Sequence, residues 1–115
     1  MKLPDVENSE VPEAKVVRYL LSTTHRAGKG KASFFLEFGF DSVRWEELAG
    51  ALKQHAMDNE IALEEKTIFG TRYVIDGLLK APNGTWLNVR SAWFIDNEGE
   101  SPRFITAHPL RRRRL

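Results

Sequence analysis

Residues 82–95, PNGTWLNVRSAWFI, decide the fold of this chain because they join a tight turn to a long alternating strand. The Asn83-Gly84 pair accepts the positive φ values that a short hairpin turn demands. From Trp86 to Ile95, the residues Leu, Val, Ser, Trp and Ile alternate with Asn, Arg, Ala and Phe. Apolar residues on both faces predict a central strand that is partly covered on both sides.

The same period of two continues on both sides of this hairpin. Residues 61–67 form a weakly alternating strand, Phe69-Gly70 a turn, and residues 71–76 a second strand that continues towards Lys80. After the polar loop 96–100, residues 103–108 form a last strand, closed by Pro109. The order predicts a four-stranded antiparallel meander.

Helical periodicity dominates the first half of the chain. Pro12 suits the first position of a helix that runs to about Leu21, and residues 31–38 predict a short aromatic helix ended by Gly39. The clearest helix follows a cap at Asp41 or Ser42 and repeats its apolar residues at steps of three and four: Trp45, Leu48, Ala49, Leu52 and Ala56. Two or three N-terminal helices followed by four strands predict an α+β two-layer sandwich, with helices on one face of the sheet and the other face more open.

Length and composition indicate one globular domain. We expect a flexible lead at residues 1–10, a single α+β domain at residues 11–109 and a basic tail at residues 110–115. The absence of cysteine excludes a disulfide framework, a thiolate zinc site and a cysteine nucleophile. No apolar run approaches the roughly 20 residues of a membrane span, so we expect a cytoplasmic protein without membrane association.

The formal net charge of +1 hides an uneven distribution. Four of the 17 basic residues are Arg111–Arg114, which leaves 13 basic residues against 16 acidic ones in the rest of the chain. Affinity for polyanions would therefore come from local patches and the tail. The tail is either simply disordered or a salt-sensitive attachment to RNA, DNA or an acidic partner.

A basic, glycine-rich stretch, THRAGKGKASFF at residues 24–35, is the first candidate site. His25 can act as a general acid or base, since an unperturbed imidazole titrates near neutral pH. The neighbouring cations and glycine N–H groups could grip a phosphate: Arg26, Gly28, Lys29, Gly30 and Lys31. The alternative is an ordinary solvated loop. A nucleotide-hydrolysing phosphate loop is not favoured, because the Gly-Lys-Ser/Thr ending and the preceding strand are missing.

The sheet supplies a second set of candidates. Arg90 lies on the strand face opposite Leu87 and Val89, where a central arginine needs a ligand or an ion pair, for which Glu64 or Asp76 is the alternative. Thr106 and His108 share one face of the last strand by the period of two. A hydroxyl beside an imidazole could orient a phosphate, although an ordinary strand threonine is the simpler interpretation.

The remaining aromatic residues and histidines are interpreted mainly as structural. Trp45 and Trp93 lie in apolar stripes typical of a core, whereas Trp86 beside the hairpin turn is a plausible exposed platform for stacking a base. His55 lies near a helix end, where a positive imidazole favours the dipole. Three scattered histidines without paired carboxylates argue against zinc or magnesium, so we expect no cofactor.

Several of these pieces occur together in a recognisable arrangement: Tyr19-Leu20-Leu21, the Gly-Lys-x-Lys-Ala-x-Phe-Phe run from Gly28, Gly39-Phe40 leading to Trp45-x-x-Leu48, Arg90-x-x-Trp93 and Thr106-Ala107-x-Pro109. The arrangement, which covers residues 16–109, resembles an uncharacterised family of small bacterial domains, sometimes attached to larger toxin-like or phage-associated proteins. That family has no established activity. Its members usually carry an aromatic residue after Thr-Ala, whereas this chain has His108.

The order of helices and strands is also similar to the barnase, EndoU, colicin and RelE-like ribonuclease superfamily of metal-independent, RNA-cleaving toxins. This resemblance implies acid/base cleavage of RNA phosphodiesters, in which His25 acts as acid or base and Thr106 orients the phosphate. The phosphate would be held by Arg26, Lys31 and Arg90. The implied partners are RNA and a cognate antitoxin or immunity protein, or a larger toxin-like protein. The alternative is a non-enzymatic interaction module that binds a partner protein or toxin and docks through its basic tail.

Overall fold

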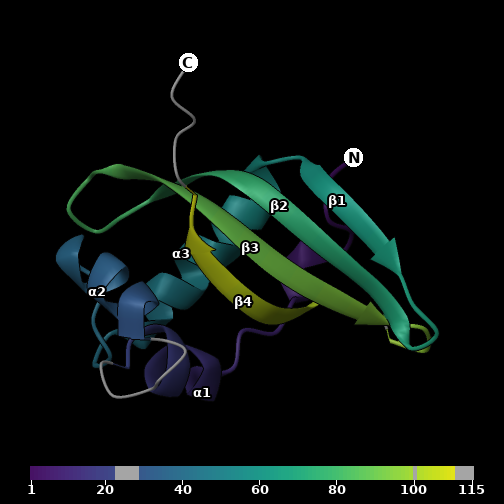
Figure 1. The fold of residues 1–115 in the computed structure, drawn as a ribbon, viewed down its shortest axis with the longest axis horizontal. Coiled ribbons are helices and arrows are strands. Elements are labelled where there is room, and N and C mark those ends of the chain that lie inside the picture. The colour runs from purple at the N-terminus through teal and green to yellow at the C-terminus, as the bar shows by residue number, and fades with distance from the viewer. Residues whose placement is uncertain (23–28, 100, 111–115) are drawn as a thin grey trace.

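The computed structural model describes residues 1–22, 29–99 and 101–110, with their side chains except those of residues 29–31. Short helices come first, followed by two longer helices and four strands (Figure 1). The elements are η1 (Val6–Asn8), α1 (Glu13–Lys15) continued by η2 (Val16–Leu20), α2 (Lys29–Glu37), α3 (Trp45–Asp58), β1 (Ile61–Lys66), β2 (Gly70–Lys80), β3 (Trp86–Asp96) and β4 (Arg103–Pro109). The predicted α+β architecture is confirmed.

The four strands form one antiparallel sheet in the order β1-β2-β3-β4, as the meander pattern predicts. The β2–β3 hairpin pairs its strands from Lys80↔Trp86 to Gly70↔Asp96. At the turn, Gly84 takes φ 88°, while the Asn83 side chain accepts the Thr85 N–H at 3.0 Å. This turn therefore sets the register of the two central strands.

One face of the sheet forms the core with the helices. In Figure 1, α3 crosses behind the sheet, and α2 lies near the end of the sheet where the β2–β3 hairpin turns. The largest fully buried side chains come from the helices η2, α2 and α3 and from the strands β2, β3 and β4: Leu20, Phe35, Leu48, Leu52, Ile75, Leu79, Trp93 and Phe104. Burial of this apolar surface is the main favourable contribution to folding.

Two segments differ from what the sequence predicts. Leu3 and Val6 are buried in the core, whereas residues 1–10 were expected to form a flexible lead. Short segments with two apolar residues carry little periodic signal, so the packing of such a lead is decided by tertiary contacts. Helix α2 begins at Lys29, two residues before the expected start, so Lys29 and Gly30 are helical rather than part of a loop. No helix within the described ranges is long and apolar enough to cross a membrane.

Candidate functional site

The face of the sheet turned away from α3, here called the open face, carries a row of polar residues. The strand register places Asp76 of β2, Arg90 of β3 and His108 of β4 opposite one another, and we call these three residues the polar row. Thr106 lies two residues before His108 and is paired with Ala92 on the same face. Directly opposed residues have Cβ atoms about 4.5–5.5 Å apart, so Arg90 is within reach of both of its neighbours.

Arg90 and Asp76 form a two-pronged ion pair. The Arg90 Nε and Nη2 groups donate to Asp76 Oδ1 and Oδ2 at 2.7 and 2.8 Å. These hydrogen bonds are the main reason that the pKa of Asp76 lies below its ordinary value, and they raise the pKa of Arg90. The pair is partly exposed, so we expect it to add little to stability. It instead fixes the plane of the guanidinium while engaging two of its five N–H donors.

His108 completes the polar row with a defined ring orientation. Its Nδ1 lies 3.2 Å from the carbonyl oxygen of Pro109. A carbonyl only accepts hydrogen bonds, so Nδ1 carries the proton and Nε2 of the neutral ring is the proton acceptor. A fixed cation and a proton-accepting imidazole are therefore neighbours on adjacent strands.

The polar row contains part of the site that the sequence predicts. Arg90, Thr106 and His108 lie on one face of the sheet, and their roles in a site stay predictions. His25, Arg26 and Gly28 lie outside the described residues, so their approach to Arg90 stays a prediction. Lys29, Gly30 and Lys31 are placed only as backbone in the first turn of α2, which packs next to the edge strand β4. Asp76, considered in the sequence only as an ion-pair partner, is the group that positions Arg90.

His55 lies on the other side of β3, in a buried network. Its Nδ1 is 3.1 Å from Ser91 Oγ, and its Nε2 is 2.9 Å from Val89 O and 3.1 Å from Gly77 O. Trp93 Nε1 donates to the same Ser91 oxygen at 2.9 Å. Nε2 therefore carries the proton, and Nδ1 accepts the Ser91 hydroxyl hydrogen.

Burial is the largest cause that lowers the pKa of His55, so its ring is neutral. This corrects the interpretation of His55 as a cation at a helix end. Its hydrogen bonds to Ser91 and Val89 instead fasten β3 to α3 on either side of Arg90.

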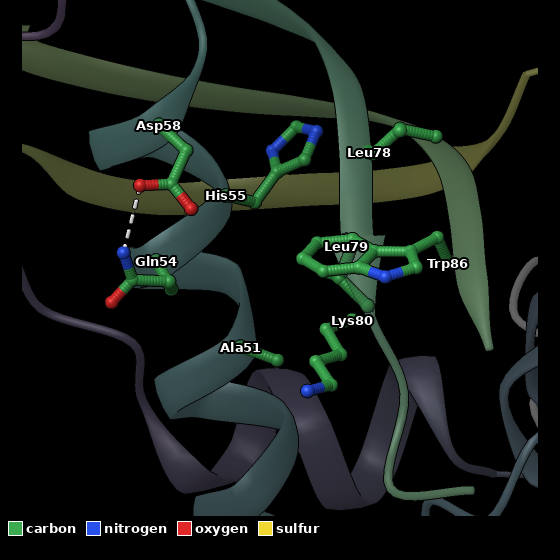
Figure 2. A pocket seen from close by; sticks show the side chains of 8 residues that line it. All are labelled: Ala51, Gln54, His55, Asp58, Leu78, Leu79, Lys80 and Trp86. Atoms are coloured by element: carbon green, nitrogen blue, oxygen red, sulfur yellow. Dashed lines mark hydrogen bonds between the residues drawn. The ribbon is translucent and has the colours of Figure 1, made fainter. Parts of the chain in front are cut away.

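A small cavity lies beside the hairpin, between α3 and the last residues of β2 (Figure 2). Its volume is about 180 Å³, and its wall includes Trp86, whose side chain is 55% exposed. The sequence predicted Trp86 as an exposed platform, and the structure places it on the same strand as Arg90. Within the described part of the chain, no three His, Asp or Glu side chains gather in a way that could hold a metal ion.

Comparisons with known proteins identify relatives of the chain without naming an activity. The sequence model of a family described as "Domain of unknown function (DUF6883)" matches residues 2–111. No curated protein matches the chain significantly. The fold is similar to that of a chain in the solved structure "Contact-dependent growth inhibition toxin - immunity protein complex from Klebsiella pneumoniae 342". The TM-score is 0.68 at 21% identity, over 87% of this chain and 98% of that chain, which shows a shared fold.

Proposed function

We propose that this chain, which belongs to the DUF6883 family, is a toxin-related ribonuclease domain that cleaves RNA phosphodiesters without a metal ion. The observation that carries the proposal is the pairing of Arg90 with His108 across β3 and β4. Phosphodiester cleavage needs a cation for the phosphate and a group that transfers protons, and the polar row offers both. The shared fold with a chain of a toxin–immunity complex supports the toxin-related part of this proposal.

In this reaction, the 2′-oxygen of a ribose attacks the neighbouring phosphorus and the bond from phosphorus to the 5′-oxygen breaks. The products are a 2′,3′-cyclic phosphate and a 5′-hydroxyl end. A base takes the proton of the 2′-hydroxyl, and an acid gives a proton to the departing 5′-oxygen. His108 takes one of these roles through Nε2, and His25 is proposed for the other.

Arg90 donates hydrogen bonds to the non-bridging phosphate oxygens, whose negative charge grows in the transition state. Asp76 holds the guanidinium in place, so less conformational freedom is lost when the phosphate binds. Thr106 is proposed to orient the phosphate. The basic stretch supplies the remaining phosphate contacts in this proposal: Arg26, Gly28, Lys29, Gly30 and Lys31.

The test compares Arg90→Ala with Arg72→Ala. Arg72 is a matched control because it is also a partly exposed arginine of the sheet and pairs with Glu65 at 2.8 Å. RNA is incubated with each protein in EDTA, and the ends of the products are analysed. We expect cyclic phosphate ends, a rate about 10²–10³-fold lower for Arg90→Ala, and a nearly unchanged rate for Arg72→Ala. Intact RNA with the unmodified protein, or equal rates for the two variants, would contradict the proposal.

A second candidate function is binding of a partner protein, such as an immunity protein or a larger toxin-like protein. The β1–β2 turn exposes Ile68 and Phe69, at 83% and 73% of their surface. The turn is held by hydrogen bonds from Asn97, whose Nδ2 donates to Ile68 O at 2.7 Å and whose N–H donates to Phe69 O at 3.0 Å. Exposed apolar side chains on a well-ordered turn are typical of an interface anchor.

The partner-binding function is tested with the double variant Ile68→Ser/Phe69→Ser and with a truncation that removes residues 111–115. If the turn is the anchor, the double variant loses binding to a co-purified partner by about 10-fold or more, because buried apolar anchors dominate interface energies. If the tail is a docking arm, the truncation weakens binding mainly at low salt. Both variants should cleave RNA at the normal rate. Unchanged partner binding in both variants would exclude this second function.

A further inference from the structure

The cavity beside Trp86 is small and has one aromatic wall. It holds about 180 Å³, less than the roughly 300–1,000 Å³ of pockets that bury a whole drug-sized ligand, so it suits a single ring system. Ala51 of α3 and Leu79 of β2 give it apolar sides, and the Lys80 ammonium lies 5.8 Å from the Trp86 ring centroid (Figure 2). A flat aromatic ring can stack on Trp86 in this space.

The α3 side of the cavity carries hydrogen-bonding groups. Gln54 Nε2 donates to Asp58 Oδ1 at 2.8 Å. In Figure 2, one carboxylate oxygen of Asp58 is joined to Gln54, and Asp58 is one of the residues that line the cavity. A carboxylate accepts hydrogen bonds from exocyclic amino groups, which cytosine, adenine and guanine carry. Uracil has carbonyl oxygens in their place and would be disfavoured beside Asp58.

Trp86 connects the cavity, which lies beside α3, with the strand face that carries Arg90. Trp86, Asn88 and Arg90 alternate with the buried residues of β3, so they lie along one face of the strand. Trp86 and Arg90 are four residues apart, which is about 13 Å along a strand. A short stretch of extended single-stranded RNA spans this distance, whereas the bases of a duplex are stacked inside and cannot enter a cavity.

From these features we infer that the cavity binds one unpaired base of a single-stranded RNA substrate, with Trp86 stacking on the base and Asp58 accepting from its amino group. This inference rests on the proposed function, because it assigns a base subsite to the RNA that Arg90 holds. Sequence-tolerant stacking on an exposed aromatic side chain, beside cations that attract the backbone, is a common way to bind single strands. The amino-group contact adds a preference for cytosine over uracil.

The test uses short oligodeoxynucleotides, which lack the 2′-hydroxyl and cannot be cleaved by the proposed reaction. Binding is measured by fluorescence anisotropy of labelled oligodeoxycytidine and oligodeoxyuridine. We expect Trp86→Ala to bind about 10-fold more weakly, and Trp86→Phe to keep most of the affinity because it keeps a stacking ring. Phe69→Ala is the matched control, since Phe69 is an exposed aromatic residue at the other hairpin turn, and its affinity should not change.

Base preference provides the second readout. The unmodified protein should bind oligodeoxycytidine about 5-fold to 10-fold more tightly than oligodeoxyuridine, and Asp58→Asn should remove most of that difference. Equal affinity in Trp86→Ala and Phe69→Ala would overturn the inference, as would a preference that Asp58→Asn leaves unchanged. These results are separate from the cleavage assay. Trp86-dependent binding without cleavage would refute the ribonuclease proposal, whereas normal cleavage with Trp86-independent binding would refute only the base subsite.

Discussion

His108→Ala is expected to slow RNA cleavage by about 10²–10⁴-fold, the usual contribution of a positioned general acid or base. The contact of His108 Nδ1 with Pro109 O leaves Nε2 as the nitrogen that exchanges protons. Arg90, its opposite neighbour on β3, brings the phosphate to this nitrogen. Loss of the imidazole removes proton transfer but leaves the guanidinium and its partner Asp76 in place.

A proton-transfer role can be separated from a structural one with His108→Gln. Glutamine retains a side-chain amide of similar size but cannot transfer a proton near neutral pH. We expect one limb of the pH–rate profile to disappear in His108→Gln, while RNA affinity and the urea midpoint remain close to those of the unmodified protein. Asn88→Ala, an exposed residue of the same face, is the control and should keep both the rate and the profile. A His108→Gln protein with the original rate and profile would remove His108 from the mechanism.

The polar row contains two cross-strand pairings, and one of them can be deduced from the sequence. The Asn83-Gly84 turn pairs Lys80 with Trp86, and counting back along both strands places Asp76 opposite Arg90. The alternation of side chains along a strand leaves Glu64 and Asp76 as alternative ion-pair partners of Arg90, because alternation identifies the face of a residue but not its neighbour on the next strand. A hairpin turn with a defined length contains the missing information, since it sets the register of both strands.

The pairing of Arg90 with His108 could not be counted in this way. Between β3 and β4 the register shifts after Ala92, where Thr106 is opposite Ala92 and Phe104 is opposite Trp93. The extra residue of such a bulge depends on packing against the core and has no signature in the alternation of β4. Parity therefore predicted that Thr106 and His108 share a face, but not which residue of β3 lies beside each of them.

The role of His55 was missed for a different reason. His55 lies three residues after Leu52, on the apolar stripe of α3 that faces the core. Ser91 belongs to the alternate residues of β3 that face inward. A polar residue on a buried stripe needs a buried partner, and these two supply each other's hydrogen bonds. The helix end favours a charged imidazole and the buried stripe favours a neutral one, and burial decides between them.

Stability should fall between pH 8 and pH 5 because of His55. Burial lowers its pKa in the folded state below the ordinary value of 6.5, so the unfolded chain binds a proton more readily than the folded chain. The stabilisation is complete above about pH 6.5 and is lost as the pH falls from there towards the lowered pKa, by at most about 1.4 kcal/mol per pH unit. Asp76, Asp41 and Glu60 have lowered pKa values and lose their stabilisation only in more acidic solution, below about pH 4.

Two variants isolate this effect in urea unfolding experiments. His55→Ala should lower the free energy of unfolding at pH 8 by about 2–5 kcal/mol, because it leaves a cavity and removes the hydrogen bonds to Ser91 and Val89. His55→Gln should lose less at pH 8, and its stability should change little between pH 8 and pH 5, because the amide does not titrate. A slope between these pH values that is the same in His55→Gln and in the unmodified protein would show that another group is responsible. In that case, the neutral histidine between α3 and β3 would not be the acid-sensitive support of the strand that carries Arg90.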